Sequence, residues 1–339
     1  MKKIFFSFAV AAVALVACNK EDMKVSGPDV KSEPVTLTVG VEGAQTKAVG
    51  VVGDATDEAK INTLQVFVFN GEIIDGYGVV ANDSKVTIGC TVGAREIYAL
   101  VNVPDCKSVT TKSQLLALVS HLSNDVNDFE MIGRKNENIT KETSSVSVAV
   151  DRFAARVVVK KITNALSSPA LQNQKFTVKS IHLNNVADDL DYARTAGYAP
   201  TKWYNKGCYE AGNSLSLVTF DAIGTDLNPS ASYTTAHYLY GYPNKAAFSS
   251  EATWAPRRTM LVLKIQIGAR LYNYPILLPE FEYNKSYEID EIQITRPGNV
   301  DDGTPGGSDE QVPVEGKDCV FNISVNPWTV VPVTNGTVI

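Results

Sequence analysis

The chain has 339 residues, of which 44% are hydrophobic, and it carries a formal net charge of −6. This length is enough for about two domains of ordinary size with a substantial core. The acidic balance argues against binding to nucleic acid, or to an acidic membrane surface, through bulk electrostatics. Attachment to a membrane is therefore expected to come from lipid and not from a basic patch.

Residues 1–17 are typical of a lipoprotein signal peptide. Two lysines give a positive start, residues 4–14 form a short apolar run, and Leu-Val-Ala at residues 15–17 leads directly to Cys18. The apolar run is too short to span a bilayer, and a cysteine directly after small residues is unusual in an ordinary cleavage site. We therefore expect cleavage before Cys18 and acylation of that cysteine, with an ordinary signal peptide or a membrane anchor as the alternative.

Residues 18–34 are polar and contain glycine and proline, which predicts a tether. From residue 35 onward, most apolar runs alternate with polar residues at period two and are rich in Val, Ile, Thr and Tyr. This pattern is typical of strands with one face on a core, so we predict a mainly β protein with sandwich-like domains. The clearest predicted strands cover residues 35–41, 64–69, 95–103, 145–150, 156–162, 176–183, 260–267 and 320–325.

Three segments interrupt the strand pattern. Residues 184–232 are rich in Asn, Asp, Gly and aromatics, which predicts long loops, and the acidic Gly/Pro/Ser/Asp segment 298–316 is predicted to be mobile. One helix is predicted behind the capping candidates Thr110 and Thr111, with its apolar stripe on a sheet. The apolar residues at helical spacing are Leu115, Leu116, Leu118, Val119 and Leu122.

Besides Cys18, the chain has four cysteines and no C-x-x-C pair, so no zinc motif is present. In an exported chain these thiols can form disulfides, but four cysteines allow three pairings and the sequence does not select one. Separate buried thiols are the alternative. The four residues are Cys90, Cys106, Cys208 and Cys319.

No catalytic constellation stands out. The histidines occur in no H-E-x-x-H pattern, and there is no G-x-S-x-G elbow, Walker loop or dinucleotide-binding fingerprint. The acid pairs at residues 188–189 and 301–302 are expected in loops, solvated or touched by calcium, and not as an acid/base pair. We therefore predict no enzyme, no cofactor and no dedicated metal site. The histidines are His121, His182 and His237.

An aromatic-rich region at residues 192–209 suggests a ligand-binding surface. Exposed aromatic rings mark binding sites when they form a contiguous patch, and such a patch can stack on sugars. Loop aromatics that pack down as a satellite core are the alternative. The candidates for a ligand platform are Tyr192, Tyr198, Trp203 and Tyr204.

A series of short segments is spread over nearly the whole chain, and each is largely a strand-edge pattern. The segments are residues 64–70, 98–104, 131–133, 148–156, 238–244, 287–289 and 325–328. Taken in this order and together with the lipoprotein signal, they resemble the Bacteroidetes fimbrillin family, the FimA-type pilins that build type V pili.

The resemblance implies two β-sandwich-like, transthyretin-like domains. The first covers residues 35–147 and contains the one helix, and the second covers residues 148–339. It also implies a pilin that travels as a lipoprotein to the outer membrane, is cut by a trypsin-like protease and polymerises by strand exchange into a cell-surface fimbria. The implied partners are other fimbrillin subunits, that protease and a host or bacterial surface ligand. A tip or accessory adhesin, a carbohydrate-binding surface lipoprotein and a pilus anchor are the alternatives.

Residues 35–47 form the predicted removable segment. Its apolar residues alternate with polar ones, as in a strand with one buried face. The small, polar run that follows predicts an exposed loop, with the bond between Lys47 and Ala48 as the candidate cleavage site and an uncut loop as the alternative. Loss of the strand would expose a groove with two unpaired strand edges. The apolar residues are Val35, Leu37, Val39 and Val41.

Residues 320–333 form the predicted donor strand. Phe321, Ile323 and Val325 share one face of an extended chain, and the acidic segment before them supplies reach. Pro327 is expected to break the ladder or bend the strand, after which Trp328 would fill a further part of a neighbour's groove. The alternative is that this segment completes the sheet of its own subunit.

Overall fold

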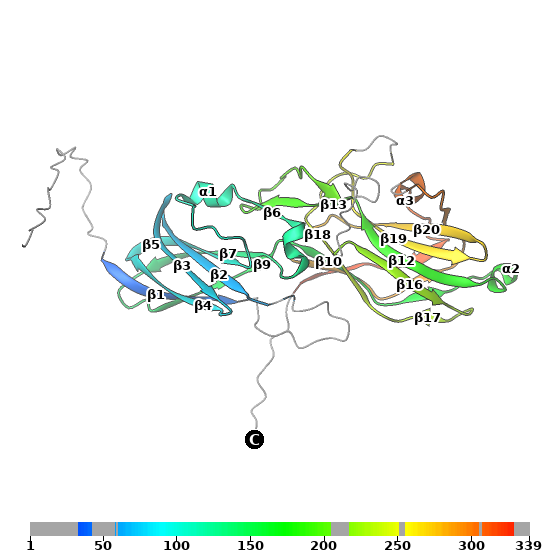
Figure 1. Cartoon of the computed structure of the whole chain (residues 1–339), viewed down its shortest axis with the longest axis horizontal. Coiled ribbons are helices and arrows are strands. Elements are labelled where there is room, and N and C mark those ends of the chain that lie inside the picture. Colours follow the sequence, from blue (N-terminus) through cyan, green and yellow to red (C-terminus); the bar gives the residue numbers. More distant parts are fainter. Residues whose placement is uncertain are drawn as a thin grey trace, which may run out of the picture. The chain divides into compact units, whose positions relative to one another are not determined.

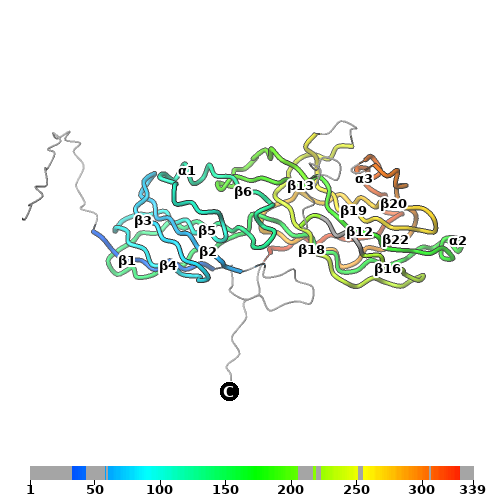
Figure 2. The backbone as a smooth tube through the Cα atoms, viewed as in Figure 1, coloured from blue at the N-terminus to red at the C-terminus, as the bar shows by residue number. Residues whose placement is uncertain are grey.

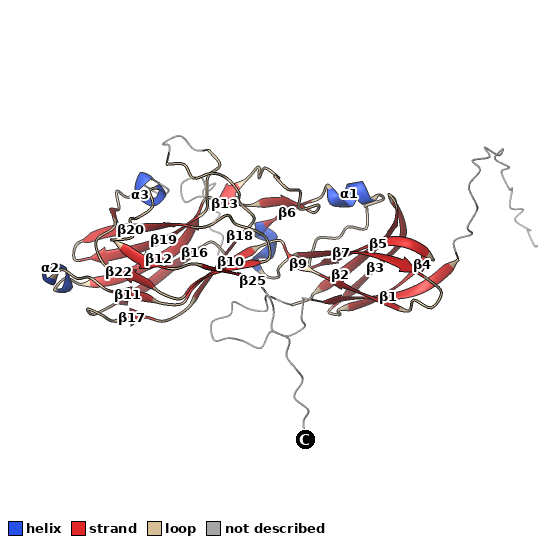
Figure 3. Ribbon diagram, turned by 180° about the vertical axis from the view of Figure 1, so that it is seen from behind, coloured by secondary structure: helices blue, strands red, loops and turns tan. Residues whose placement is uncertain are grey.

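The computed structural model describes residues 33–42, 58, 60–204, 217–250, 255–304 and 307–328. It is mainly β, as predicted, and its helices are short (Figure 3). Within the described residues, no helix is both long and apolar enough to cross a membrane. Cys18, Lys47, Ala48, Cys208 and residues 329–333 lie outside the described part of the chain.

Two sheets built by the first half of the chain form a sandwich (Figure 1). The three-stranded sheet has the order β4 (Lys85–Thr91), β1 (Pro34–Glu42), β8 (Ser145–Ala149). The five-stranded sheet has the order β3 (Ile73–Ala81), β2 (Thr63–Asn70), β5 (Gly93–Val101), β7 (Met131–Ile139), β9 (Asp151–Arg152). Because β4 contacts β2 and β3, and β8 contacts β5 and β7, the two sheets share one core.

Gly133 in β7 allows the two sheets to approach closely at one point. A Cβ atom at this position would lie 2.0 Å from the carbonyl oxygen of Ala149, at the end of β8. No side chain fits at that distance, so glycine is required here. The Met-Ile-Gly segment at residues 131–133 is therefore explained by packing between the sheets.

The second half of the chain forms three larger sheets. The five-stranded sheet has the order β16 (Thr219–Asp226), β12 (Phe176–Asn184), β19 (Met260–Ile267), β20 (Arg270–Leu277), β23 (Asn299–Val300). One four-stranded sheet has the order β18 (His237–Gly241), β10 (Ala155–Val159), β21 (Lys285–Ile289), β25 (Ser324–Pro327). The other has the order β17 (Ser232–Tyr233), β11 (Ile162–Asn164), β22 (Ile292–Ile294), β24 (Cys319–Phe321).

The two four-stranded sheets are built from the same stretches of chain. In each stretch two residues without strand structure separate a strand of one sheet from a strand of the other. These are residues 160–161 between β10 and β11, 290–291 between β21 and β22, and 322–323 between β24 and β25. The single strands predicted over residues 156–162 and 320–325 are therefore each divided between two sheets. The remaining elements are β6 (Val119–His121) paired with β14 (Asp189–Asp191), β13 (Val186–Ala187) paired with β15 (Trp203–Tyr204), α1 (Lys112–Leu116), the 3₁₀ turn η1 (Leu122–Val126), α2 (Pro169–Gln172) and α3 (Ser308–Gln311).

The strands change partners after Arg152. β8 pairs with β1 and β9 pairs with β7, whereas β10 pairs with β18 and β21. The division expected between residues 147 and 148 falls inside β8. We therefore propose that the boundary between the two sandwich-like domains lies at residues 153–154.

The predicted helix is much shorter than expected. α1 contains only Leu115 and Leu116 of the five apolar residues, and Thr111 caps it by accepting a hydrogen bond from the backbone N–H of Gln114. The chain then becomes extended, because β6 pairs with β14, far away in the sequence. The prediction is wrong beyond Leu116, since tertiary strand pairing outweighs local helical spacing in so short a segment.

The two segments predicted to lack regular structure are also more ordered than expected. Residues 184–232 contain β13 to β17, and residues 298–316 contain β23 and α3. Three consecutive polar side chains of α3 are buried, because amide side chains of β12, β20 and the residue after β12 bond to them. The bonds join Asp309 to Asn273 (2.6 Å), Glu310 to Asn184 (3.0 Å) and Gln311 to Asn185 (2.9 Å).

A chain of buried polar groups connects β6 with the residue after β18. The Ser120 hydroxyl bonds to the Glu130 carboxylate and lies 2.6 Å from the hydroxyl of Tyr242, while Asn124 donates to Glu130 at 2.9 Å. Burial raises the pKa of Glu130 to about 7, even though Ser120 and Asn124 lower it. Burial also raises the pKa of the neighbouring Asp125. Burial therefore favours the protonated form of both carboxyl groups.

The contribution of Glu130 to stability is expected to fall as the pH rises from about 4.5 to about 7. An acid whose pKa is raised by folding opposes folding once it ionises, and for Glu130 the cost is on the order of 3 kcal/mol. Replacing Glu130 with glutamine should remove much of this pH dependence in urea denaturation. Glu137→Gln is the matched control, because Glu137 lies on β7, the strand that begins directly after Glu130, but is only half-buried. Parallel stability curves for wild type and Glu130→Gln between pH 5 and 8 would contradict the prediction.

Candidate functional site

β1 lies between two strands that are far from it in the sequence. It pairs antiparallel with β4, with Leu37 opposite Ile88, and parallel with β8, with Val39 opposite Val146. Figure 2 shows β1, in blue, running beside β4. The side chains of Leu37 and Val39 are completely buried, and those of Val35 and Val41 are partly buried against the same core.

The burial pattern shows what removal of β1 would expose. Each fully buried Leu or Val side chain contributes about 1.5 to 3 kcal/mol relative to an exposed one. Without β1, β4 and β8 would each lose a hydrogen-bonding neighbour and present an unpaired edge to solvent. Such a pair of edges over an apolar floor is suited to receive another extended chain.

The predicted donor segment lies on its own subunit as far as it is described. β24 pairs with β22 and β25 pairs with β21, and Phe321 and Ile323 are half-buried against the core. Val325 is 46% exposed and lies opposite Tyr287. In this structure residues 320–328 therefore complete sheets of their own subunit, because β21 and β22 each supply a partner strand, and donation to a neighbour stays a prediction.

Trp328 ends the described C-terminal segment and is only 2% exposed. Its indole N–H donates to Glu58 Oε2 at 2.9 Å, and its backbone N–H donates to the carbonyl of Asn284 at 2.9 Å. The guanidinium groups of Arg152 and Arg156 lie over its ring, 4.5 and 5.2 Å from the centroid. We call Trp328, Glu58, Arg152, Arg156 and Tyr240 the Trp328 cluster.

Glu58 holds the Trp328 cluster together. Its carboxylate also accepts bonds from Arg156 and from the hydroxyl of Tyr240, both at 2.8 Å, and its backbone carbonyl accepts one from Arg152 Nε at 2.9 Å. Arg152 is almost completely buried, and burial lowers its pKa to about 10, partly offset by Glu58. The cluster therefore combines buried charges of opposite sign with stacked aromatic rings.

Of the four candidates for a ligand platform, one lies in the core. Tyr192 is buried and its ring packs 5.3 Å from that of Phe153, so it belongs to the core. Tyr198 is half-buried and its hydroxyl lies 3.4 Å from Asp189, while Trp203 and Tyr204 are half-buried in β15. The prediction is wrong for Tyr192, because that side chain fills the core under the loop.

The histidines and the first acid pair have structural partners. His121 lies in β6, where its Nδ1 is 3.0 Å from Asp188, and Asp189 accepts bonds from the backbone N–H groups of Thr201 and Lys202. Both aspartates are buried, so the expectation of a solvated pair is wrong. His182 Nε2 lies 3.5 Å from Glu310, and His237 Nε2 lies 2.9 Å from the hydroxyl of Tyr233.

The three described cysteines are separate buried thiols. Burial raises the pKa of Cys106 to about 11 and that of Cys319 to about 12, and it also raises the pKa of Cys90. At neutral pH these groups are thiols and not thiolates. Poor reactivity and a role in packing follow.

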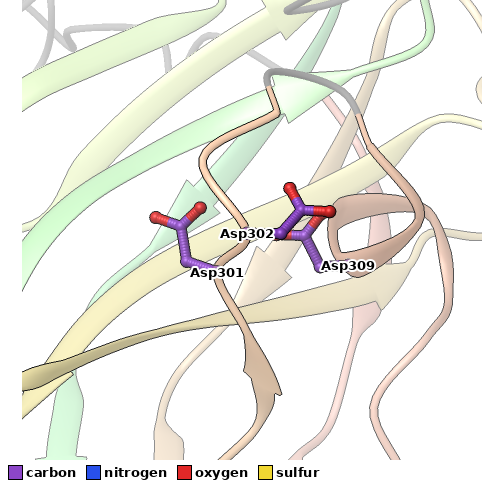
Figure 4. Close-up of side chains that lie close together, drawn as sticks. All are labelled: Asp301, Asp302 and Asp309. Carbon is purple, nitrogen blue, oxygen red and sulfur yellow. The ribbon is translucent and has the colours of Figure 1, made fainter.

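Three aspartates next to α3 lie close together (Figure 4). Asp301 and Asp302 follow β23, Asp309 belongs to α3, and one carboxylate oxygen from each lies within 4.8 Å of the others. Lys264 Nζ lies 2.6 Å from Asp301, and Asn273 donates to Asp309. The protein itself therefore supplies a positive charge and a donor to the group, and we assign it no cation.

The comparisons with known proteins point to one family. Residues 34–166 match the model of the FimA major fimbrial subunit family. A major fimbrium subunit FimA type-2 from Porphyromonas gingivalis is 32% identical over 129 residues, which are 36% of this chain and 31% of that protein. The chain thus matches about a third of the length of this relative.

Solved structures extend the likeness to most of the chain. A fimbrilin, FimA, of Porphyromonas gingivalis W83 has a TM-score of 0.58 at 18% identity and covers 88% of this chain and 98% of its own. A Bacteroides eggerthii protein assigned to cell adhesion has a TM-score of 0.61 at 18% identity, over 89% of this chain and 98% of its own. At these identities the structures show a shared fold.

Proposed function

We propose that this chain, which belongs to the fimbrillin family through residues 34–166, is a structural subunit of a cell-surface fimbria that supports adhesion. The observation that carries the proposal is the position of β1. It is a central strand with two buried apolar side chains, yet it lies on the N-terminal side of the candidate cleavage bond after Lys47.

Assembly then follows from strand exchange. The precursor is exported with a lipid on Cys18 and stays at the outer membrane while β1 fills the groove between β4 and β8. A trypsin-like protease cuts after Lys47, β1 leaves, and a C-terminal strand from the next subunit takes its place. Backbone pairing along two edges supplies affinity, and the apolar floor under Leu37 and Val39 sets the register.

Donation has a cost that the described contacts make explicit. A C-terminal strand that moves to a neighbour must leave β21 and β22, and Trp328 must leave the Trp328 cluster. The neighbour's groove offsets this cost, because it buries apolar residues that are only half-buried on their own subunit, such as Phe321 and Ile323.

Limited trypsin treatment of the non-lipidated precursor tests the proposal. We expect a new N-terminus at Ala48, followed by fibres in electron micrographs. Lys47→Gln should block both, whereas the control Lys31→Gln, on the other side of β1, should block neither. Cut protein that stays monomeric would favour a tip or accessory subunit. Wild-type protein that trypsin does not cut after Lys47 would favour an anchor or a ligand-binding lipoprotein. Fibres from uncut Lys47→Gln would exclude release of β1 as the trigger.

A further inference from the structure

The C-terminal segment is held unevenly along its length. Cys319 at its start and Trp328 at its end are buried, but no residue from 320 to 327 is buried. Among the described residues, β25 is the edge strand of its sheet and pairs with β21 alone, and all four of its residues are exposed. An exposed edge strand of four residues contributes little packing, so the retention of residues 324–328 depends mainly on Trp328.

The groups around Trp328 come from distant parts of the subunit. Glu58 precedes β2, Arg152 ends β9, Arg156 lies in β10 and Tyr240 lies in β18. Phe129 adds an edge-to-face contact at 5.3 Å, and Arg152 also donates to the backbone carbonyl of Trp328 at 3.2 Å. The two cation–π contacts and the bond to a buried carboxylate form only while Trp328 is in place.

We propose that the Trp328 cluster is a latch that holds the C-terminal strand on its own subunit and sets the rate at which the strand is donated. This inference rests on the proposed function for its role in assembly, although the latch itself is a property of the single subunit. Opening requires the indole to leave two guanidinium groups and the Glu58 carboxylate. Once it has left, the described contacts that retain the strand are the exposed ladder between β25 and β21 and the pairing of β24 with β22.

Glu58→Gln tests the latch without altering any residue of the donated strand. The glutamine keeps the shape of the side chain but removes the negative charge that both arginines and the indole N–H share. A bond to a charged group is worth a factor of about 10 to 100 in an opening equilibrium. Amide hydrogen exchange in residues 324–328 of the uncut monomer should therefore become about 10- to 100-fold faster, while exchange in β19 stays unchanged.

Glu288→Gln is the matched control. Glu288 lies on β21, directly beside β25, and approaches Arg156 at 3.8 Å, but no contact of Glu288 with Trp328 is found among the described residues. This variant should exchange like the wild type. Trp328→Phe, which keeps an aromatic ring but removes the indole N–H, should accelerate exchange at the same amides and serves if Glu58→Gln folds poorly.

The assembly step has its own readout. After trypsin cleavage, Glu58→Gln should begin to form fibres sooner than wild type or Glu288→Gln. Unchanged exchange in residues 324–328 of Glu58→Gln and Trp328→Phe would overturn the latch. Faster exchange with unchanged fibre formation would overturn its role in assembly. A wild-type protein that is cut but forms no fibres would count against the proposed function and leave the exchange result to decide on the latch.

Discussion

Replacing Leu37 with aspartate is expected to lower the free energy of unfolding of the uncut protein by about 4 kcal/mol or more. Leu37 is completely buried between β4 and β8. Loss of a buried leucine side chain alone costs about 2 to 5 kcal/mol, and a carboxylate in the same place must either lose its hydration or become protonated. Urea denaturation of the purified, non-lipidated precursor at neutral pH measures the effect.

The control for this prediction is Thr36→Asp. Thr36 lies on the same strand but its side chain is exposed, so the added charge should change the stability by less than about 0.5 kcal/mol. The comparison separates burial from a general effect of charge on β1. Equal losses in the two variants would mean that the inward face of β1 does not support the sandwich.

The same pair of variants reports on the fate of β1 after cleavage. If β1 leaves with the segment cut at Lys47, the substitution leaves with it, and cut Leu37→Asp and cut wild type should have the same stability and form fibres equally. A difference that persists in cut, purified protein would mean that β1 remains bound. In the uncut Leu37→Asp precursor, β1 should be held less tightly between β4 and β8. Trypsin should then cut after Lys47 faster, because local opening of β1 exposes the bond.

The strands were predictable from the sequence where one face is buried. β1, β2, β12 and β19 lie within a few residues of their predicted bounds, because apolar side chains alternate along them or fill both faces. The length of the helix was overestimated, because the residues after it form β6, whose partner β14 lies about 70 residues away in the sequence. Local spacing carries no information about such a partner.

Polar segments were harder to predict than apolar ones. The sequence Asp309-Glu310-Gln311 is indistinguishable from a solvated loop until amide side chains from β12 and β20 are brought next to it. Its burial depends on complementary donors and not on hydrophobicity. The same reason explains why the buried aspartates at residues 188–189 were expected in solvent.

The candidate site was predictable in part. The alternation along residues 35–41 identified β1, but the Trp328 cluster joins residues from 58 to 328 and has no local pattern. One signal was present in the sequence. Arg152 and Arg156 flank the apolar run Phe153-Ala154-Ala155, and a long cationic side chain beside a buried run requires a partner, here an acid and an aromatic ring.

The second large effect is expected from shortening the C-terminus. A chain that ends after Asp318 loses β24, β25 and Trp328, leaves β21 and β22 with one partner fewer, and leaves Arg152 and Glu58 without the indole. Removal of a buried tryptophan side chain alone costs about 3 to 5 kcal/mol. We expect the free energy of unfolding to fall by about 5 kcal/mol, or folding to fail.

A chain that ends after Trp328 is the matched control for this truncation. This protein keeps every described contact of the C-terminal segment, so the difference between the two truncated proteins reports on β24, β25 and Trp328 alone. Equal urea midpoints for the two truncated proteins would mean that β24, β25 and Trp328 do not support their own subunit.

The difference in stability between the two truncated proteins has a direct meaning for assembly. It estimates the free energy with which a subunit holds its own C-terminal strand. A neighbour's groove must supply more than this amount before residues 319–328 are donated. If the difference exceeds what a strand gains on entering the groove between β4 and β8, donation of residues 319–328 is unfavourable and a strand beginning beyond Trp328 must fill the groove instead.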